Sequence, residues 1–152
     1  MEYARRRGYD ALITFDADGQ HNPHDIPLLL EKLKDADLVI GIRAINSHEM
    51  PYVKRLGNMG LNLFTRIVFG VTSKDSQSGL RAFNRKAIES IRLRTNRYEV
   101  SSEILFEART KNLKIKEVEV HTIYTLYSKG RGTGVLDGFK ILWRMLIHNK
   151  VH

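Results

Sequence analysis

Two aspartates separated by a single residue, Asp16 and Asp18, follow the apolar run of residues 11–15. Alternate residues of an extended chain point the same way, so both carboxylates converge on one point if strand geometry persists to Asp18. Such ligands suit Mg²⁺ or Mn²⁺, which one or two carboxylates hold while water and phosphate oxygens fill the other positions. Gly19 then allows a sharp turn. The pattern predicts a metal site that handles a diphosphate or, alternatively, a polar turn, because Asp and Gly are common turn formers.

The elements around these aspartates alternate between strand and helix. We expect a helix to end at residues 3–7, a buried strand at 11–15, a helix that starts at Asn22-Pro23 and buries Ile26, Leu29, Leu30 and Leu33, and a second buried strand at 37–42. A strand, a helix and a strand within about thirty residues form a βαβ unit, which implies a parallel sheet. Ligands of such sheets bind beyond the carboxyl ends of the strands, where Asp16, Asp18 and Arg43 fall.

The rest of the chain continues the pattern. Residues 51–70 read as an amphipathic helix, which packs on the core or lies on a membrane surface. The further expected elements are a polar loop at 75–80 that leads into a short strand, helices at 85–91 and 101–110 with Ser101 as the cap of the second, a half-solvated edge strand at 113–121, a glycine-rich cationic loop at 124–134 and a closing helix at 136–147.

Composition limits the possible classes of protein. The chain has 152 residues, the size of one domain, and contains no cysteine, which excludes disulfides, thiolate zinc sites and cysteine nucleophiles. Its net charge of +8 favours anionic partners such as nucleotides, nucleic acid or phospholipid head groups, although solubility alone also explains an excess of this size. No apolar run approaches the roughly 20 residues that span a bilayer, and no signal peptide is recognisable at the start.

These pieces, in this order, resemble the dolichol-phosphate mannosyltransferase branch of the family 2 glycosyltransferases and its bacterial polyprenyl-phosphate relatives. The resemblance covers nearly the whole chain. Its most specific parts are Asp-Ala-Asp-Gly-Gln-His at 16–21, Gly-Ile-Arg at 41–43, Asp-Ser-Gln-Ser-Gly-Leu-Arg at 75–81 and Ser-Lys-Gly-Arg-Gly at 128–132. It implies an α/β fold of the GT-A, Rossmann-like type, with a mostly parallel sheet flanked by helices in a single domain over residues 1–152.

The resemblance also implies roles for individual side chains. Asp16 and Asp18 are expected to hold Mg²⁺ or Mn²⁺, with Gln20 as a further oxygen ligand, so that the metal bridges the donor's diphosphate. Catalytic roles fall to Arg81 and to Asp75, which orients the acceptor or the metal shell, or caps its own loop. The residues expected to bind the acceptor phosphate or the donor diphosphate are Arg43, Arg55, Ser78, Arg81, Lys129 and Arg131, and for Arg55 and Lys129 a solvated cation is an equally open interpretation.

The implied reaction transfers a sugar from a nucleotide-sugar donor to a polyprenyl (dolichyl) phosphate and inverts the anomeric carbon. A phosphate is already ionised near neutral pH, so positioning and charge stabilisation matter more than a general base. The segment 51–70 gives such an enzyme a way to meet an acceptor whose tail lies in a bilayer, and we expect a cytoplasmic protein that is peripheral at the membrane. We interpret His21 and His24 as polar surface residues.

The front of the chain departs from the family pattern. Family members begin with a strand and an open turn that bind the nucleotide, well upstream of the Asp-x-Asp motif, whereas here fifteen residues precede Asp16. We therefore expect an amino-terminally truncated GT-A fold, with a metal-binding and acceptor-side portion that has weak or no activity alone. A separately encoded amino-terminal half is one candidate partner.

Two other classes of function stay open. A non-catalytic basic module that binds a membrane surface or nucleic acid is the main alternative, and Tyr124 and Tyr127 beside the cationic loop give nucleic acid slight support, although packing against the sheet is the favoured interpretation for both. A sugar nucleotidyltransferase also handles nucleotide diphosphates with a metal, but it needs a glycine-rich amino-terminal loop that this sequence lacks.

Overall fold

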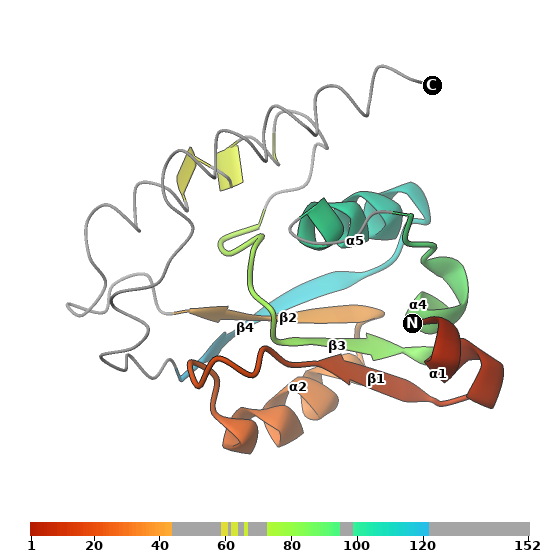
Figure 1. The fold of residues 1–152 in the computed structure, drawn as a ribbon, viewed down its shortest axis with the longest axis horizontal. Helices are drawn as coiled ribbons and strands as arrows, with labels where there is room; N and C mark the ends of the chain where they lie inside the picture. The colour runs from red at the N-terminus through yellow and green to blue at the C-terminus, as the bar shows by residue number, and fades with distance from the viewer. Residues whose placement is uncertain (44–58, 61, 64–65, 67–72, 95–98, 122–152) are drawn as a thin grey trace.

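The computed structural model describes residues 1–43, 59–60, 62–63, 66, 73–94 and 99–121 (Figure 1). In chain order its elements are α1 (Glu2–Arg7), β1 (Ala11–Thr14), the 3-10 helix η1 (Pro23–Asp25), α2 (Ile26–Leu33), β2 (Leu38–Arg43), β3 (Arg81–Asn84), α4 (Arg85–Ser90), α5 (Glu99–Thr110) and β4 (Ile115–Val120). The described residues between 59 and 66 are helical, in agreement with the helix predicted there. The rest of that segment, the cationic loop at 124–134 and the closing helix at 136–147 lie outside the described residues.

The strands of the described residues form one mixed sheet in the order β1-β3-β2-β4. Strand β3 is antiparallel to both β1 and β2, whereas β2 and β4 are parallel. Strands β1, β2 and β4 therefore run in one direction and finish at the end of the sheet where β3 begins. The predicted α/β class is confirmed, and β3 inserts as an antiparallel member between the two strands of the predicted βαβ unit.

Helices cover both faces of this sheet, with α4 and α5 on one side and α2 on the other (Figure 1). Alternation along β2 supplies both cores, because successive strand side chains point to opposite faces. Leu38 and Ile40 pack with the cluster under α1, α4 and α5, whereas Val39 packs with the cluster on α2. All three are fully buried, as the predicted buried strand requires.

The ends of the helices agree with the sequence predictions in two places and differ in one. Gly8 ends α1 in the left-handed conformation at φ 69°, and the side chain of Asn22 accepts the His24 N–H at the start of η1. Helix α5 begins at Glu99, so Ser101 lies inside the helix and its prediction as the cap is wrong.

Two burial predictions are also wrong. Leu30, placed on the buried face of α2, is 40% exposed, whereas Leu29 and Leu33 of the same helix are buried. Strand β1 is half-exposed instead of buried, because in the described part of the chain it pairs with β3 on one side alone. The predicted edge position of β4 is confirmed within the same sheet.

The buried carboxylate of Asp37 fastens the amino end of β2. It accepts hydrogen bonds from the Lys114 N–H at 2.8 Å, the Asn84 side chain at 2.9 Å and the Lys86 ammonium at 3.0 Å. Burial opposes ionisation, but these donors outweigh it and hold the pKa of Asp37 below its ordinary value of 3.8. The group therefore joins β2, β3, α4 and the chain that leads into β4.

Replacing Asp37 with alanine is expected to lower the free energy of unfolding at pH 7 by about 1–3 kcal/mol, because buried donors lose their acceptor. Since the folded pKa is depressed, the carboxylate stabilises the fold above its ordinary pKa of 3.8 and loses this effect as the pH falls through the folded value. Urea denaturation between neutral and acidic pH measures both effects. The control is Asp35→Ala, which removes an exposed pair with Lys116 and should change stability by less than about 0.5 kcal/mol. Equal acid sensitivity of Asp37→Ala and the parent chain would contradict this assignment.

Candidate functional site

The register of β1 and β3 brings the Asp-x-Asp loop against the loop of residues 75–81. Thr14, the last residue of β1, pairs with Arg81, the first of β3, so two further steps place Asp16 opposite Gly79. The Thr14 hydroxyl donates to the Gly79 carbonyl at 2.8 Å. A Cβ atom built on Gly79 would lie 1.9 Å from Oδ2 of Asp16. The Asp16 carboxylate therefore occupies the space that any side chain at position 79 would need.

Asp18 lies in a turn and not in a strand. Strand β1 ends at Thr14, so alternation along an extended chain does not direct Asp16 and Asp18 to the same point. Instead, Oδ1 of Asp18 accepts the Gln20 N–H at 3.0 Å, a turn that Gly19 completes at φ 76°. Both carboxylates are exposed, and Gln20 is half-buried.

The loop of residues 75–81 is buried and tied to the sheet. Asp75 is 3% exposed, its N–H donates to the Ser73 hydroxyl at 3.2 Å, and its carbonyl accepts the Ser78 N–H at 3.2 Å. The Ser78 hydroxyl donates to the carbonyl of Gly41 in β2 and is buried with it. Asp75 and Ser78, which the sequence predicted as site residues, are thus buried and hydrogen-bonded within the protein.

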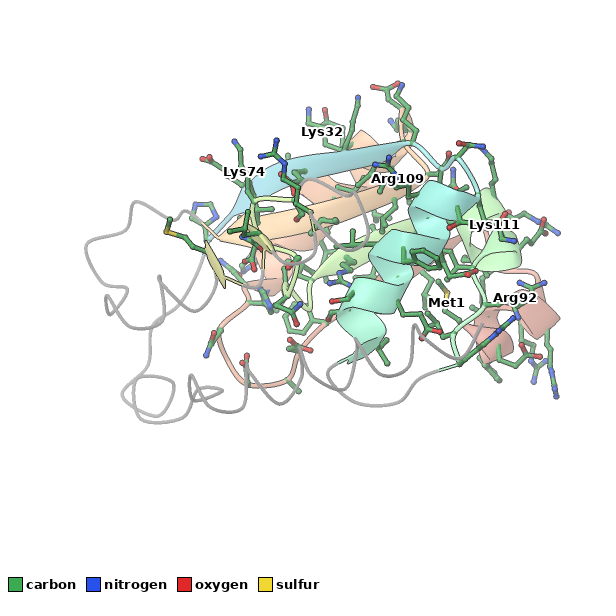
Figure 2. The ribbon with its side chains drawn as sticks, turned by 90° about the horizontal axis from the view of Figure 1, so that it is seen from above. Met1, Lys32, Lys74, Arg92, Arg109 and Lys111 are labelled. Carbon is green, nitrogen blue, oxygen red and sulfur yellow. The ribbon has the colours of Figure 1, made fainter. Side chains whose placement is uncertain are left out.

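Two side chains from other elements fix the start of this loop. Asn62 accepts from the N–H and the hydroxyl of Ser76, at 2.9 and 2.8 Å, and donates to the Lys74 carbonyl at 2.6 Å. Glu117 of β4 accepts from the Ser73 hydroxyl at 2.7 Å and from the Lys74 N–H at 2.9 Å. Figure 2 shows Lys74 toward the end of the sheet where β4 finishes, away from Met1 and Arg92.

The guanidinium of Arg81 lies in the core under α5. Arg81 is 2% exposed and donates to the carbonyls of Ser76 at 2.8 Å and Ser101 at 3.3 Å. Burial lowers the pKa of Arg81 to about 10, against the opposing attraction of Asp75 and Asp16. The arginine stays charged at neutral pH and forms a fixed cation between the two acidic loops.

Asp25 joins η1 to the residue that follows β4. Asp25 is buried and accepts both the N–H and the Nδ1 of His121, each at 2.9 Å. This pair connects η1, directly after the Asp-x-Asp loop, with the carboxyl end of β4. The expectation that His21 is a surface residue is wrong: it is 7% exposed and its ring meets Phe15 edge-on at 5.8 Å, whereas His24 is exposed as predicted.

Of the remaining predicted site residues, one lies within the described part of the chain. Arg43 is the last residue of β2 and lies at the same end of the sheet as Asp16. Arg55, Lys129 and Arg131 lie outside the described residues, so their phosphate-binding roles stay predictions.

The Asp-x-Asp loop carries oxygen atoms of the chemical type that a hard divalent cation prefers. Two exposed carboxylates and the Gln20 amide sit on one short loop, and Mg²⁺ commonly takes one or two carboxylates and completes its shell with water and phosphate oxygens. Among the described residues, no three His, Cys, Asp or Glu side chains converge as a metal site. The loop therefore carries oxygen ligands of a suitable chemical type, and a role for them in metal binding stays a prediction.

Several structural contacts were not expected from the sequence. Asn62, Glu117 and the Asp25–His121 pair hold the walls of the site through contacts between residues far apart in the chain, and no short motif identifies them. Gly79 carries a local signal, since glycine inside a strand-leading segment often marks a close approach of another group.

The sequence profile of the family described as glycosyl transferase family 2 matches residues 2–92 of the chain. This match covers more than half of the sequence, including both acidic loops. The chain belongs to glycosyl transferase family 2. The family predicted from the motifs is thus confirmed.

Curated relatives with polyprenyl-phosphate transferase names support the predicted branch of family 2. A UDP-N-acetylglucosamine–dolichyl-phosphate N-acetylglucosaminyltransferase of Methanococcus voltae is 44% identical over 154 residues, which cover 97% of this chain and 61% of the relative. A dolichol-phosphate mannosyltransferase of Pyrococcus furiosus is 30% identical over 145 residues, 91% of this chain and 39% of the relative. An uncharacterized protein of Methanocaldococcus jannaschii is 48% identical over 143 residues, covering 90% of this chain and 59% of that protein. The chain thus spans about three-fifths of the length of its more similar relatives.

No helix in the described part of the chain is both long enough and apolar enough to cross a membrane.

Replacing Gly79 with alanine is expected to displace the Asp16 carboxylate, because the added methyl group overlaps it, and to change the free energy of unfolding by less than about 1 kcal/mol, because Asp16 is exposed and can rotate away. Thermal unfolding and a crystal structure of the variant measure the two effects. The matched control is Gly60→Ala, since a Cβ there meets nothing within 4 Å in a helical segment, and it should be neutral or slightly stabilising. An unchanged Asp16 position in Gly79→Ala would refute the contact.

Proposed function

We propose that this protein transfers a sugar from a nucleotide-sugar to a polyprenyl phosphate, with inversion at the anomeric carbon and with Mg²⁺ or Mn²⁺ as cofactor. The observation that carries the proposal is the contact of Asp16 with Gly79, which brings together two of the four most specific motifs of the resemblance at one end of the sheet. Ligands of α/β sheets bind at this end. The names of the relatives from Methanococcus voltae and Pyrococcus furiosus support the class of acceptor.

In this proposal the exposed Asp-x-Asp loop faces the donor. Asp16 and Asp18, with the Gln20 amide, would hold the divalent cation, which would supply positive charge to stabilise the diphosphate leaving group. The Asp16 carboxylate lies beside the backbone of Gly79, and Oδ1 of Asp18 accepts the Gln20 N–H of its own turn, so the position of each carboxylate is restricted before a ligand binds. Such preorganisation reduces the reorganisation that binding requires.

The acceptor side needs cations and no strong base. A bond forms between an oxygen of the lipid phosphate and the anomeric carbon, while the bond from that carbon to the donor's phosphate oxygen breaks and the nucleoside diphosphate departs. The attacking oxygen is already ionised at neutral pH, so the residues must orient it and offset charge. Arg43 ends β2 beside the site and is our first candidate for this role, with Arg55, Lys129 and Arg131 as further candidates and with Ser78 and Asp75 shaping the wall.

The helical segment that carries Asn62 supports association with a membrane surface. Met59 and Leu63 are each 57% exposed and four residues apart, so they share one helix face with the exposed Arg66. Asn62 points instead to the loop of residues 75–81. An apolar face with a flanking cation is typical of helices that lie in a membrane interface, which also keeps open the alternative of a basic module that binds membranes without catalysis.

Replacing Asp16 or Asp18 with asparagine is expected to reduce Mn²⁺ affinity and sugar transfer by about 10- to 100-fold or more, because each variant removes a charged ligand. Transfer is measured from GDP-mannose, UDP-glucose and UDP-N-acetylglucosamine to polyprenyl phosphate, with the chain alone and with the amino-terminal part of a relative added. Asp10→Asn is the control, an exposed aspartate paired with Arg85. Unaltered metal binding in both site variants, together with no transfer from any donor, would defeat the proposal.

The double variant Met59→Gln, Leu63→Gln is expected to reduce binding to anionic vesicles several-fold, because it removes exposed apolar area from the proposed membrane face. Flotation with vesicles of phosphatidylglycerol and phosphatidylcholine measures it. The control, Phe106→Gln, alters an exposed apolar residue of α5 that is 39% exposed. If the parent chain does not float with anionic vesicles, the membrane role is wrong; if it floats without any transfer activity, the non-catalytic alternative gains.

A further inference from the structure

The position of Arg81 does not suit a residue that grips a ligand phosphate. Arg81 belongs to β3, an interior strand of the described sheet. Its guanidinium is covered by α5 and by the loop of residues 75–81. With 2% of the residue exposed, a phosphate could reach it only after the carbonyls of Ser76 and Ser101 were displaced. Its Nε is buried without a hydrogen-bond partner in the described part of the chain.

A charge buried in this way must be compensated, because an isolated ion in the protein interior is strongly unfavourable. Two backbone carbonyls accept from the guanidinium, and the carboxylates of Asp75 and Asp16 attract it. These two carboxylates belong to different loops, 59 positions apart in the sequence. The hydrogen bond to Ser76 holds the loop of residues 75–81 directly, whereas Asp16 is reached by charge attraction alone.

The strand register explains why the attraction reaches Asp16. Arg81 lies opposite Thr14, and side chains directly opposite on antiparallel strands point to the same face. Two residues further along, Asp16 covers Gly79, so its carboxylate extends over the segment that leads directly to Arg81. The buried Arg81 cation, the glycine at position 79 and the exposed Asp16 carboxylate thus lie next to one another.

We propose that Arg81 is a positioning residue: its buried guanidinium holds the loop of residues 75–81 and the Asp16 carboxylate in place, and it does not contact the phosphates of donor or acceptor. The importance of this role for sugar transfer rests on the proposed function. The structural role itself does not, because Arg81 would hold both loops in place without any ligand bound.

The primary test is hydrogen exchange of the 152-residue chain without metal or nucleotide. Arg81→Gln is expected to accelerate amide exchange by about tenfold in peptides that cover residues 73–80 and also in those that cover residues 15–20, because charged hydrogen bonds to the first loop and the attraction to the second are lost. Arg81→Lys keeps the charge and should protect residues 15–20 partly. The control is Arg85→Gln. This arginine is the first residue of α4, pairs with Asp10 and Glu89 at the surface, and its replacement should leave both loops unchanged.

A reciprocal variant covers the case in which Arg81→Gln fails to fold. Asp16→Asn removes an exposed carboxylate, so the fold should survive, and it is expected to accelerate exchange in residues 76–81 if Asp16 and the buried cation are coupled. No change in residues 76–81 in this variant, or no change in residues 15–20 in a folded Arg81→Gln, would overturn the proposal.

Ligand binding separates positioning from direct contact. A positioning role lowers Mn²⁺ affinity in Arg81→Lys even without nucleotide, by about 10-fold, as for residues that support metal ligands, whereas a role in phosphate binding alone leaves metal binding intact and weakens only pyrophosphate. The second result would overturn the proposal. If the parent chain transfers no sugar while the exchange pattern is as expected, the proposed function fails and the positioning role stands.

Discussion

Burial of the Arg81 guanidinium is the constraint on which the arrangement of the site depends. A cation at the centre of a sheet needs acceptors and opposite charge, since the interior offers neither from water. The chain supplies them from the carbonyls of Ser76 and Ser101 and from the carboxylates of Asp75 and Asp16. The buried charge therefore requires that α5, β3 and both acidic loops lie close together. The positions of the loops follow from the need to compensate this charge when the chain folds.

Carboxylates at the two ends of the sheet differ in burial and in hydrogen bonding. At the amino end of β2, Asp37 receives donors from Lys114, Asn84 and Lys86 and is buried, so its charge is used to hold elements together. At the other end, Asp16 and Asp18 are exposed. Exposed carboxylate oxygen atoms can exchange bound water for a cation at a small cost in free energy. Asp37 would first have to break several buried hydrogen bonds. This difference in hydrogen bonding favours the end of the sheet with Asp16 and Asp18 for the proposed cation site.

The sequence allowed local features to be predicted, and it failed where distant segments decide the outcome. The buried run of β2, the glycine that ends α1 and the cap at Asn22 depend on adjacent residues and are confirmed. The exposure of Leu30 and the burial of His21 depend on what packs against them, which periodicity does not specify. The motif around Arg81 was recognised, but its placement under α5 depends on the pairing of β3 with β1 and β2, strands separated from it by nearly forty residues or more. Asn62 and Glu117 share that limitation, because their partners lie in other elements.

The direction of β3 gives the site its composition. Because β3 runs against its neighbours, the loop that precedes it, and not the one that follows, reaches the carboxyl ends of β1 and β2. The Asp16–Gly79 contact then acts as a check on register. A slip of one residue would oppose Asp16 to Ser78 or Leu80, whose side chains would fill the space the carboxylate occupies, and would turn the core residues Ala82 and Phe83 to the wrong faces. Core packing and the placement of the exposed Asp16 carboxylate are thus consistent with the same strand pairing.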